Sequence, residues 1–261
     1  MKHIFAVCAY GESPYLEECI ESLMNQTSKS EVFISTSTPN EHISKVAEMY
    51  GLKVVVNDGP SGITEDWNYA YSQTDADIVT IAHQDDTYAP EYVEKIIEYY
   101  GKATHPLIVF SDYAELRNGE VVSENTNLKI KRILLRKLRN PKNWGKKRAK
   151  RSALAYGCSI CCPAVTLVKA NLPEQVYENH FRSDEDWEAW EKLSRLDGEF
   201  VFVPEILMYH RVHEDSATTE IINDNSRTVE DYEMFCKFWP KWFAKLITKV
   251  YSLSEKSNNV Q

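Results

Sequence analysis

Two adjacent aspartates, Asp85 and Asp86, have the clearest capacity for chemistry in this chain. They follow the apolar residues 78–82, a run typical of a buried parallel strand. The ends of such strands are where open α/β sheets bind ligands. Neighbouring carboxylates repel one another, and a hard divalent cation relieves that repulsion. The pair therefore predicts a Mg²⁺ or Mn²⁺ site that bridges to a ligand's phosphates. The alternative is a turn before a helix in which Pro90 is an early residue.

A second group of carboxylates, within residues 184–188, could supply a general base. Neighbouring carboxylates raise one another's pKa, which suits a group that must accept a proton. Trp187 and Trp190 are three residues apart, so on a helix they would form an aromatic surface beside these acids. Two alternatives stay open. The acids could complement the dipole of a solvated helix N-terminus, and the tryptophans could belong to the core.

Strands and helices are predicted to alternate along the first 111 residues. Leu16, Cys19, Ile20 and Leu23 have helical spacing, and Gly51 would end the next helix. Such alternation specifies an α/β fold with a parallel, Rossmann-like sheet. We expect strands at residues 3–9, 31–35, 53–56, 77–82 and 107–111, and helices from residue 13, over 41–50, over 62–72 and over about 90–100.

The second half of the chain is less regular. We expect strands at 163–169 and 200–203, an acidic helix at about 184–196, and an aromatic, lysine-rich helix near the C-terminal end. Because there is no internal repeat and no linker rich in proline or glycine, one compact domain with a terminal appendage is the simplest organisation.

Composition limits the class of protein. The 261 residues are 43% hydrophobic, enough for a sizeable core, and no run of 18 apolar residues could span a bilayer. The first ten residues are too short and too strand-like for a signal peptide, so the six cysteines are expected to be reduced. Cys158 and Cys161 have C-x-x-C spacing. No second Cys/His pair at ligand spacing accompanies them, so we expect small buried thiols rather than a zinc site.

Charge is distributed unevenly. The net charge is −9, yet residues 129–151 hold twelve Lys/Arg and no acid, which leaves 30 − 12 = 18 bases against 39 acids elsewhere. Such a basic block in an acidic protein predicts a distinct surface with an anionic partner.

Four stretches of residues 3–215 resemble the family-2 glycosyltransferases of the GT-A fold. The acidic pair and the acidic cluster, about 100 residues apart in the family's order, are the most specific. The stretches are residues 5–10 with 15–27, Gly62 followed by Asn68 and Ala70, residues 83–86, and residues 185–188. The resemblance implies a GT-A domain over residues 1–225, divided into a nucleotide-sugar half (1–115) and an acceptor half (116–225), followed by a helical appendage (226–261).

The resemblance also implies a role for each candidate residue. Asp86, with Asp85, would bind the metal, and Asp186 would be the catalytic base. A loop that closes over the diphosphate would lie within residues 209–218, where Arg211 could pair with phosphate and His213 could contact phosphate or metal. A surface arginine and a structural histidine are the alternative. The implied donor-site residues are Ala9, Tyr10, Thr36, Gly62, Asn68, Asp85, Arg211 and His213.

Two departures from the family pattern matter. Many members have acidic residues that contact the nucleotide base, but residues 35–40 here offer hydroxyl groups and no charge. The identity of the nucleotide therefore does not follow from the sequence. His83 replaces the first aspartate seen in many members, so metal binding falls on Asp85 and Asp86.

The chemistry of sugar transfer fits these roles. The leaving diphosphate must be neutralised, the acceptor hydroxyl must lose its proton to a carboxylate, and both must be in line across the anomeric carbon. Direct attack assisted by the single base Asp186 gives inversion. The tryptophans beside it could stack on a sugar ring.

The basic block also contains an amphipathic pattern. Ile130, Ile133, Leu134 and Leu138 would share one face of a helix over residues 128–139, with basic residues around them, as in helices that lie on anionic membranes. Residues 235–249 repeat the pattern, with a lysine at every fourth position from 237 and aromatic residues suited to the headgroup zone. Nucleic acid is a competing anionic partner, but we do not expect it. The remaining alternative is a polar surface helix without a partner.

The predicted function is therefore an inverting, metal-dependent, hexosyltransferase-like enzyme. It would move a sugar from a nucleoside-diphosphate sugar to a saccharide or lipid-linked acceptor, as a cytoplasmic protein peripherally bound to the inner face of a bacterial membrane, in surface polysaccharide synthesis. Two rivals are a sugar-nucleotide nucleotidyltransferase and a non-catalytic module that binds polyanions or membranes. The loop at residues 9–13 lacks the glycines, Arg and Lys typical of the first rival.

Overall fold

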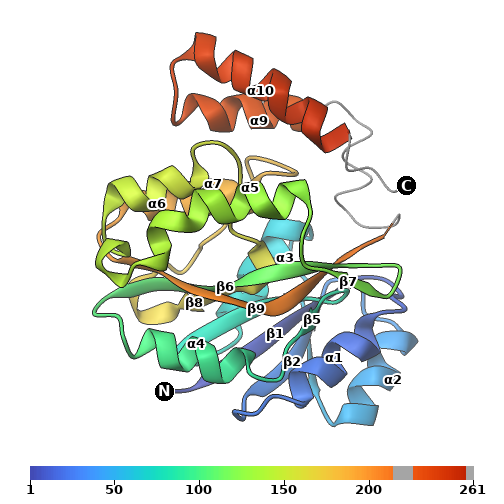
Figure 1. Cartoon of the computed structure of the whole chain (residues 1–261). Helices are drawn as coiled ribbons and strands as arrows, with labels where there is room; N and C mark the ends of the chain where they lie inside the picture. Colours follow the sequence, from blue (N-terminus) through green and yellow to red (C-terminus); the bar gives the residue numbers. More distant parts are fainter. Residues whose placement is uncertain (214–225, 257–261) are drawn as a thin grey trace.

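A computed structural model describes residues 1–213 and 226–256, and Figure 1 shows the fold. Within this part of the chain the strands form one nine-stranded sheet in the order β3-β2-β1-β4-β8-β6-β9-β5, with β7 paired to β6. Helices α5, α6 and α7 lie on one side of the sheet, α1, α2 and α4 lie on the other, and α9 and α10 form a further layer outside α5 and α7.

The N-terminal half is the parallel α/β unit that the sequence predicts. Its strands are β1 (His3–Ala9), β2 (Glu31–Thr36), β3 (Lys53–Val56) and β4 (Ile78–His83), and its helices are α1 (Leu16–Met24), α2 (Glu41–Tyr50), α3 (Ile63–Ser72) and α4 (Tyr92–Tyr100). All three strand pairs in this unit are parallel. Ala9 pairs with Thr36 and Cys8 with His83, so the carboxyl ends of β1, β2 and β4 meet at one edge of the sheet.

The strands of the second half are longer than the sequence indicates. The strands expected at 107–111 and 200–203 are longer in the structure, as β6 (Pro106–Arg117) and β9 (Glu199–Val212). The same part of the sheet also contains β5 (Thr87–Tyr88), β7 (Glu120–Val122) and β8 (Val165–Val168). The apolar pattern ends early because buried Asp112 and Glu115 lie within β6, where Arg132 and Arg117 pair with them. The extension of β9 carries residues 206–212 alongside the end of β6.

The acidic helix is confirmed as α7 (Glu185–Arg195). Trp187 and Trp190 are fully buried, so they form core rather than an aromatic surface for a ligand. The Trp187 ring packs edge-on against Phe235 of the C-terminal layer, and its indole N–H donates to the carbonyl of Leu154. These contacts fix the N-terminal end of α7, where the candidate base is located.

The C-terminal region contains two helices instead of one over residues 235–249. α9 (Ser226–Cys236) ends before Pro240, and α10 (Lys241–Lys256) begins directly after it. Proline has no N–H to donate within a helix, and its fixed φ favours a helix start. The predicted domain boundary at residue 225 lies at the end of residues 214–225, outside the described residues.

The basic segment folds as α5 (Thr126–Leu135), a short 3-10 helix (Arg136–Arg139) and α6 (Lys147–Leu154). Its apolar face is not continuous, because Leu138 is buried while Ile130 and Ile133 are exposed. In the described part of the chain no helix is long and apolar enough to cross a bilayer.

Candidate active site

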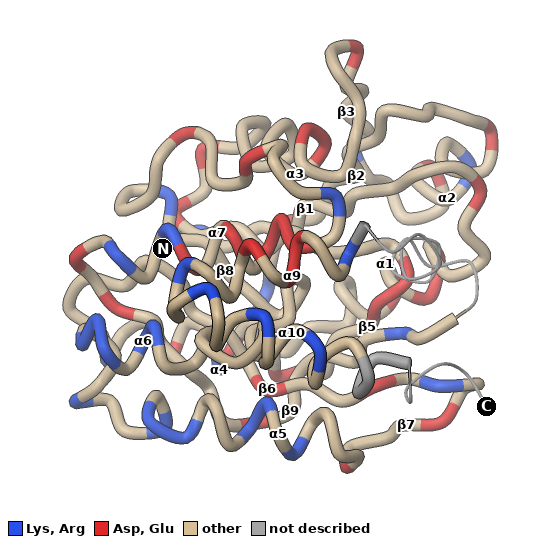
Figure 2. The backbone as a smooth tube through the Cα atoms, turned by 90° about the horizontal axis from the view of Figure 1, so that it is seen from above, with Lys and Arg blue, Asp and Glu red and all other residues tan. Residues whose placement is uncertain are grey.

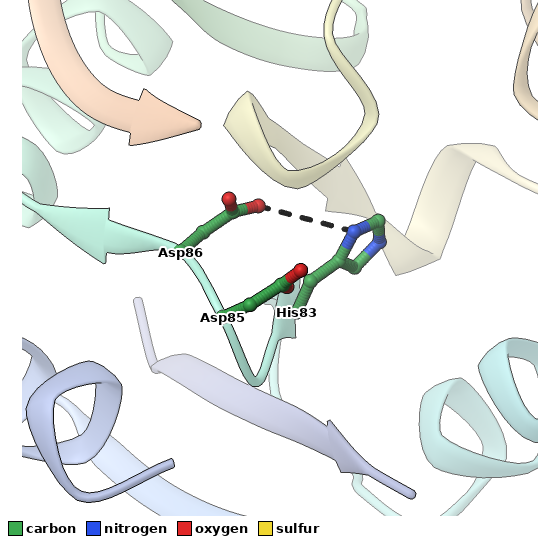
Figure 3. Close-up of side chains that lie close together, drawn as sticks. All are labelled: His83, Asp85 and Asp86. Atoms are coloured by element: carbon green, nitrogen blue, oxygen red, sulfur yellow. Dashed lines mark ion pairs between the residues drawn. The ribbon is translucent and has the colours of Figure 1, made fainter. Parts of the chain in front are cut away.

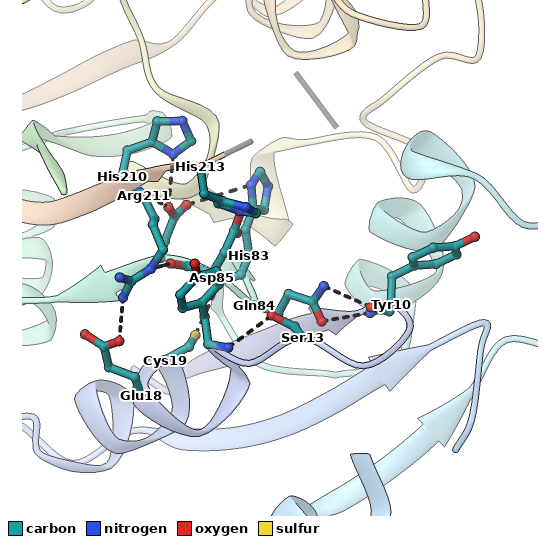
Figure 4. Close-up of polar contacts among 12 residues, drawn as sticks. Tyr10, Ser13, Glu18, Cys19, His83, Gln84, Asp85, His210, Arg211 and His213 are labelled. Atoms are coloured by element: carbon teal, nitrogen blue, oxygen red, sulfur yellow. Dashed lines mark hydrogen bonds and ion pairs between the residues drawn. The ribbon is translucent and has the colours of Figure 1, made fainter. Parts of the chain in front are cut away.

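A cavity of about 670 Å³ opens where β1 and β4 end. It brings together residues from both halves of the chain, since its lining includes Ala9, Tyr10, Gly62, Asp85, Asp186 and His213. These are six of the predicted site residues. Tyr10 is held at the rim by Gln84, whose side-chain amide oxygen accepts from the Tyr10 N–H (2.9 Å) and whose amide nitrogen donates to the Tyr10 carbonyl (3.0 Å). Figure 4 shows this pairing.

Thr36, Asn68, Asp86 and Arg211 do not line the cavity directly, and the first two have structural partners. Thr36 is buried, and its hydroxyl accepts from the N–H of Thr38 (3.0 Å). Asn68 donates to the carbonyl of Tyr177 (2.7 Å) and accepts from two backbone N–H groups in the same segment. Asn68 therefore ties α3 to the second half of the chain, a contact that shapes the site from outside it.

Asp86 is completely buried at the end of β4. Its Oδ1 accepts from the N–H of Arg211 (2.9 Å) and from Nδ1 of His210 (3.0 Å). Its Oδ2 has no hydrogen-bond partner in the described part of the chain. Burial alone would lower the pKa of His210, but the charge and hydrogen bond of Asp86 raise it to about 9.

His83 faces the two aspartates (Figure 3). Its Nδ1 lies 3.9 Å from Oδ2 of Asp86, and its ring stacks on Trp67 with centroids 5.0 Å apart. Burial lowers the pKa of His83 despite the neighbouring carboxylates, which favours the neutral ring that binds metals. The sequence analysis did not assign His83 as a ligand, although it stands directly before the acidic pair.

The three side chains fit a divalent metal. One ligand atom from each of His83, Asp85 and Asp86 lies within 4.8 Å of the others. Nε2 of His83 and Oδ2 of Asp86 are buried without hydrogen-bond partners among the described residues, an arrangement that a bound cation would relieve. Carboxylate oxygens suit Mg²⁺ and Mn²⁺, and an imidazole favours a transition metal such as Mn²⁺.

Arg211 and His213 approach the acidic pair from the end of β9 (Figure 4). Arg211 is buried, so it is not a surface arginine. Its guanidinium lies over the Tyr15 ring, contacts Glu18 (2.6 Å) and donates to the carbonyl of Asp85 (2.8 Å). His213 Nε2 donates to Oδ2 of Asp85 (3.0 Å). Residues 214–218 of the predicted closing loop lie outside the described residues.

The charges around Asp85 lower its pKa. Burial acts in the opposite direction, but the nearby rings of His83 and His210 and the hydrogen bond from His213 outweigh it. Asp85 is therefore an anion at neutral pH, as a metal ligand or a hydroxyl acceptor must be.

Asp186 stands at the start of α7 on the opposite side of the cavity. Its Oδ1 accepts from the N–H of Trp187 (2.6 Å), and its Oδ2 accepts from the Cys158 thiol (3.6 Å). Burial raises its pKa, while the Lys131 charge opposes the rise. The cause differs from the one expected: desolvation, not crowding by other carboxylates, makes Asp186 more basic. Its neighbour Glu185 has a pKa raised to about 7, mainly by burial.

A carboxylate occupies the region where the sequence analysis found only hydroxyls. Asp66 of α3 lines the cavity, and its carboxylate accepts from Ser37 (2.7 Å), just after β2, and from Asn57 (2.8 Å). Sequence reasoning missed it because the charge comes from a different element, about 30 residues further along the chain.

Lys131 is a second residue that sequence reasoning misplaced. We expected it on a membrane-facing surface, but it lines the cavity, and its Nζ donates to the hydroxyl of Tyr113 (2.8 Å). Arg132 also points inward and pairs with Asp112 (2.7 Å). Both turn inward because Leu128 and Leu135 anchor the inner face of α5 in the core.

Comparisons with known proteins identify the family and the fold of the chain. Residues 4–145 match the family model described as glycosyl transferase family 2. A Haemophilus influenzae protein named "Uncharacterized glycosyltransferase" is 21% identical over 236 residues, which cover 86% of this chain and 69% of that protein.

Two solved structures share the architecture. The first is Staphylococcus aureus TarS 1-349 in complex with UDP-GlcNAc (16% identity, TM-score 0.64, 95% of this chain and 70% of that one). The second is the mannosyltransferase PcManGT from Pyrobaculum calidifontis in complex with GDP-Man and Mn²⁺ (13% identity, TM-score 0.60, 100% of this chain and 76% of that one). At these identities the likeness shows the fold: a curled central sheet flanked by helices.

Proposed function

The chain belongs to glycosyl transferase family 2 and has a GT-A-like fold, and from this premise we propose that it is an inverting, metal-dependent glycosyltransferase. It moves a sugar, which we take to be a hexose, from a nucleoside-diphosphate sugar to a saccharide or lipid-linked acceptor in cell-surface polysaccharide synthesis. One observation carries this proposal: a single cavity is lined by the anionic Asp85 on one side and by Asp186, with its raised pKa, on the other.

The donor is assigned to the side of the cavity formed by β1, β2 and α3. Ala9, Tyr10 and Gly62 line it, and Thr36 and Asn68 support it from behind. Asp66, held by Ser37, is the carboxylate available to the nucleotide base or ribose. The two solved structures are complexes with UDP-GlcNAc and with GDP-Man and Mn²⁺, which supports a nucleotide sugar here without selecting the nucleotide.

Asp85 and Asp86, together with His83, would hold Mn²⁺ or Mg²⁺ at the diphosphate. When bound, the cation neutralises charge that develops on the leaving diphosphate. Arg211 and His213 approach the same place from β9, and both already contact Asp85. They would add charge-assisted hydrogen bonds to phosphate oxygens.

Asp186 is the proposed general base. Its carboxylate would take the proton of the acceptor hydroxyl as that oxygen attacks the anomeric carbon from the side opposite the diphosphate. A raised pKa improves proton acceptance in this role. We assign one base and one displacement, which inverts the anomeric configuration.

We also propose that the enzyme docks on the inner face of a membrane. Figure 2 shows Lys and Arg along α5 and α10. Exposed Ile130 and Ile133 on α5, and Trp242, Leu246 and Val250 on α10, lie among these charges. Basic and apolar side chains on one surface suit an anionic lipid interface.

A thermal-shift screen of nucleoside diphosphates, with and without Mn²⁺, tests the enzyme assignment. A ligand that binds only the native state raises the Tm, so at least one nucleoside diphosphate should do so in a Mn²⁺-dependent manner. The corresponding sugar nucleotide should then be slowly hydrolysed. Failure of every nucleoside diphosphate to stabilise the protein would contradict the proposal.

A further inference from the structure

A second cavity adjoins the first on the side of the candidate base. It has a volume of about 120 Å³ and lies between α5, the turn after α6, and the C-terminal helices. Four described residues line both cavities: Lys131, Cys158, Arg227 and Tyr251. The two cavities therefore lie side by side, with Lys131 at the boundary between them.

Polar and apolar side chains share the walls of the second cavity, with Asn127 on the polar side. Ile130, Leu134 and Tyr156 line it, and Ile130 and Tyr156 are also exposed at the surface. An apolar cavity of about 150 Å³ is large enough to bind benzene. The side of this smaller cavity formed by Ile130, Leu134 and Tyr156 therefore has room for a few carbon atoms of a hydrocarbon chain. Ile133, one turn further along α5 from the lining residue Ile130, is exposed, as are Trp242, Leu246 and Val250 of α10.

Lys131 places a positive charge at the junction of the two cavities. The hydroxyl of Tyr113 is its hydrogen-bond partner, and among the described residues no carboxylate lies within 4.0 Å of its Nζ. Arg132, its neighbour in sequence, is in contrast neutralised by Asp112. A partly buried cation with no carboxylate in direct contact is suited, in a cavity wall, to an anionic ligand.

The junction is close to the candidate base. The Cys158 thiol contacts Asp186 on one side and lines the second cavity on the other. An anion on Lys131 would therefore lie near the hydroxyl that Asp186 deprotonates, rather than among the β1 and β2 residues that form the donor side.

Building on the proposed function, we propose that the second cavity is the acceptor's lipid-phosphate subsite. Lys131 binds a phosphate group of the acceptor, and Ile130, Leu134 and Tyr156 hold the first part of its hydrocarbon chain. The acceptor is thus a saccharide carried on a lipid phosphate, whose sugar hydroxyl reaches Asp186 and whose chain leaves over α5 and α10 toward the membrane.

The test uses farnesyl phosphate, with farnesol and inorganic phosphate as partial probes. Binding is measured by calorimetry, with Mn²⁺ and the most stabilising nucleoside diphosphate present to occupy the donor side. Farnesyl phosphate should bind at least about tenfold more tightly than either partial probe. Lys131→Gln should weaken that binding by about tenfold, because a hydrogen bond to a charged group contributes about 1.5 kcal/mol or more. Lys131→Arg should restore part of it.

Matched variants separate this subsite from a general charge effect. Lys137→Gln removes an exposed charge from the same segment and should leave farnesyl phosphate affinity unchanged. Leu134→Asp should weaken farnesyl phosphate binding but preserve the affinity for the nucleoside diphosphate with Mn²⁺. The preserved nucleotide affinity also establishes that each variant is folded.

Three results would overturn the inference. Farnesyl phosphate that binds no more tightly than inorganic phosphate would exclude the apolar subsite. Unchanged farnesyl phosphate affinity in Lys131→Gln would exclude the lysine, and a loss confined to nucleotide affinity would assign it to the donor. Each result leaves the proposed function intact, because that function fails only if no nucleoside diphosphate binds.

Discussion

Oδ2 of Asp86 is a buried carboxylate oxygen with no hydrogen-bond partner among the described residues, while its companion Oδ1 has two. The two oxygens therefore have different roles: Oδ1 accepts hydrogen bonds from Arg211 and His210, and Oδ2 is available to a cation. A substitution that keeps the first and neutralises the second is therefore more informative than truncation.

Asp86→Asn should abolish the Mn²⁺-dependent part of nucleoside-diphosphate binding, and because it also removes the charge that pairs with His210 it should lower the Tm of a protein that still folds. An amide oxygen can still accept from the Arg211 N–H, but it loses the negative charge that a divalent cation needs. Calorimetry with and without Mn²⁺ measures the effect. Binding that remains Mn²⁺-dependent would show that the metal site has been assigned to the wrong residue.

Asp186→Asn should leave donor affinity nearly unchanged and reduce turnover by about 10²–10⁴-fold, the usual contribution of a general base. In the unmodified enzyme, burial raises the Asp186 pKa, so kcat/KM should fall on the acid side at a pH above the usual aspartate value of 3.8. The variant should lose this limb of the pH profile. A large loss of donor binding would instead place Asp186 in the donor site.

Glu185→Gln should stabilise the protein at pH 8 and have little effect at pH 4. The folded-state pKa of Glu185 is about 7 against 4.5 in the unfolded chain, so the carboxyl favours its protonated form in the fold. Its destabilising effect develops as the pH rises from 4.5 to about 7 and is complete above that range. The shift corresponds to about 3 kcal/mol. Urea unfolding of both proteins at the two pH values measures it, and an equal effect at both would refute this pKa.

The basic segment, residues 129–151, is not a single surface. Lys131 and Arg132 face inward from α5, and Lys150 and Arg151 face inward from α6, where they contact the carbonyls of residues 196 and 198 and the carboxylate of Glu191. The segment both supports the second half of the sheet and presents the remaining charges to solvent.

Arg132→Gln should lower the free energy of unfolding by about 3–5 kcal/mol. It leaves the mostly buried Asp112 without its cation, and breaking a buried ion pair from one side has a cost of this size. Lys129→Gln is the control on the same helix, because its pair with Glu124 is exposed and should contribute at most about 1 kcal/mol. Urea unfolding followed by circular dichroism compares them. Equal small effects would mean that the Asp112 pair is as well solvated as the Glu124 pair.

The contrast between the two halves explains how far the sequence predicts the structure. Strands β1 to β4 are continuous apolar runs, so their positions, their parallel order and the meeting of Ala9 and Asp85 at one edge follow from local pattern. Strands β6 and β9 contain polar residues that are satisfied by partners distant in sequence, such as Arg132 for Asp112. The helical periodicity of residues 128–139 does not predict that Lys131 points inward. Its direction depends on the core contacts of Leu128 and Leu135, which set the rotation of α5.

Helices α5 and α10 place apolar and basic side chains on the outside of the acceptor half, while the donor residues belong to β1, β2 and α3. Membrane contact through this surface would bring a lipid-linked acceptor toward Asp186 without covering the entrance used by a soluble nucleotide sugar. The residues that make this contact are different from those first expected, because Lys131 and Arg132 are turned inward.

Replacing Arg136, Lys137, Lys241 and Lys245 with glutamine should release the protein from anionic vesicles and spare hydrolysis of a soluble sugar nucleotide. Each basic residue near such a surface contributes about 1 kcal/mol, so the loss of four is decisive. In the unmodified protein, high salt should weaken vesicle binding without abolishing it, because exposed Ile133 and Trp242 provide an apolar contribution that salt does not screen. Trp242→Ser should reduce this salt-resistant fraction in a sedimentation assay with charged vesicles. Protein that ignores such vesicles at low salt but binds nucleic acid tightly would assign these charges to a polyanion instead.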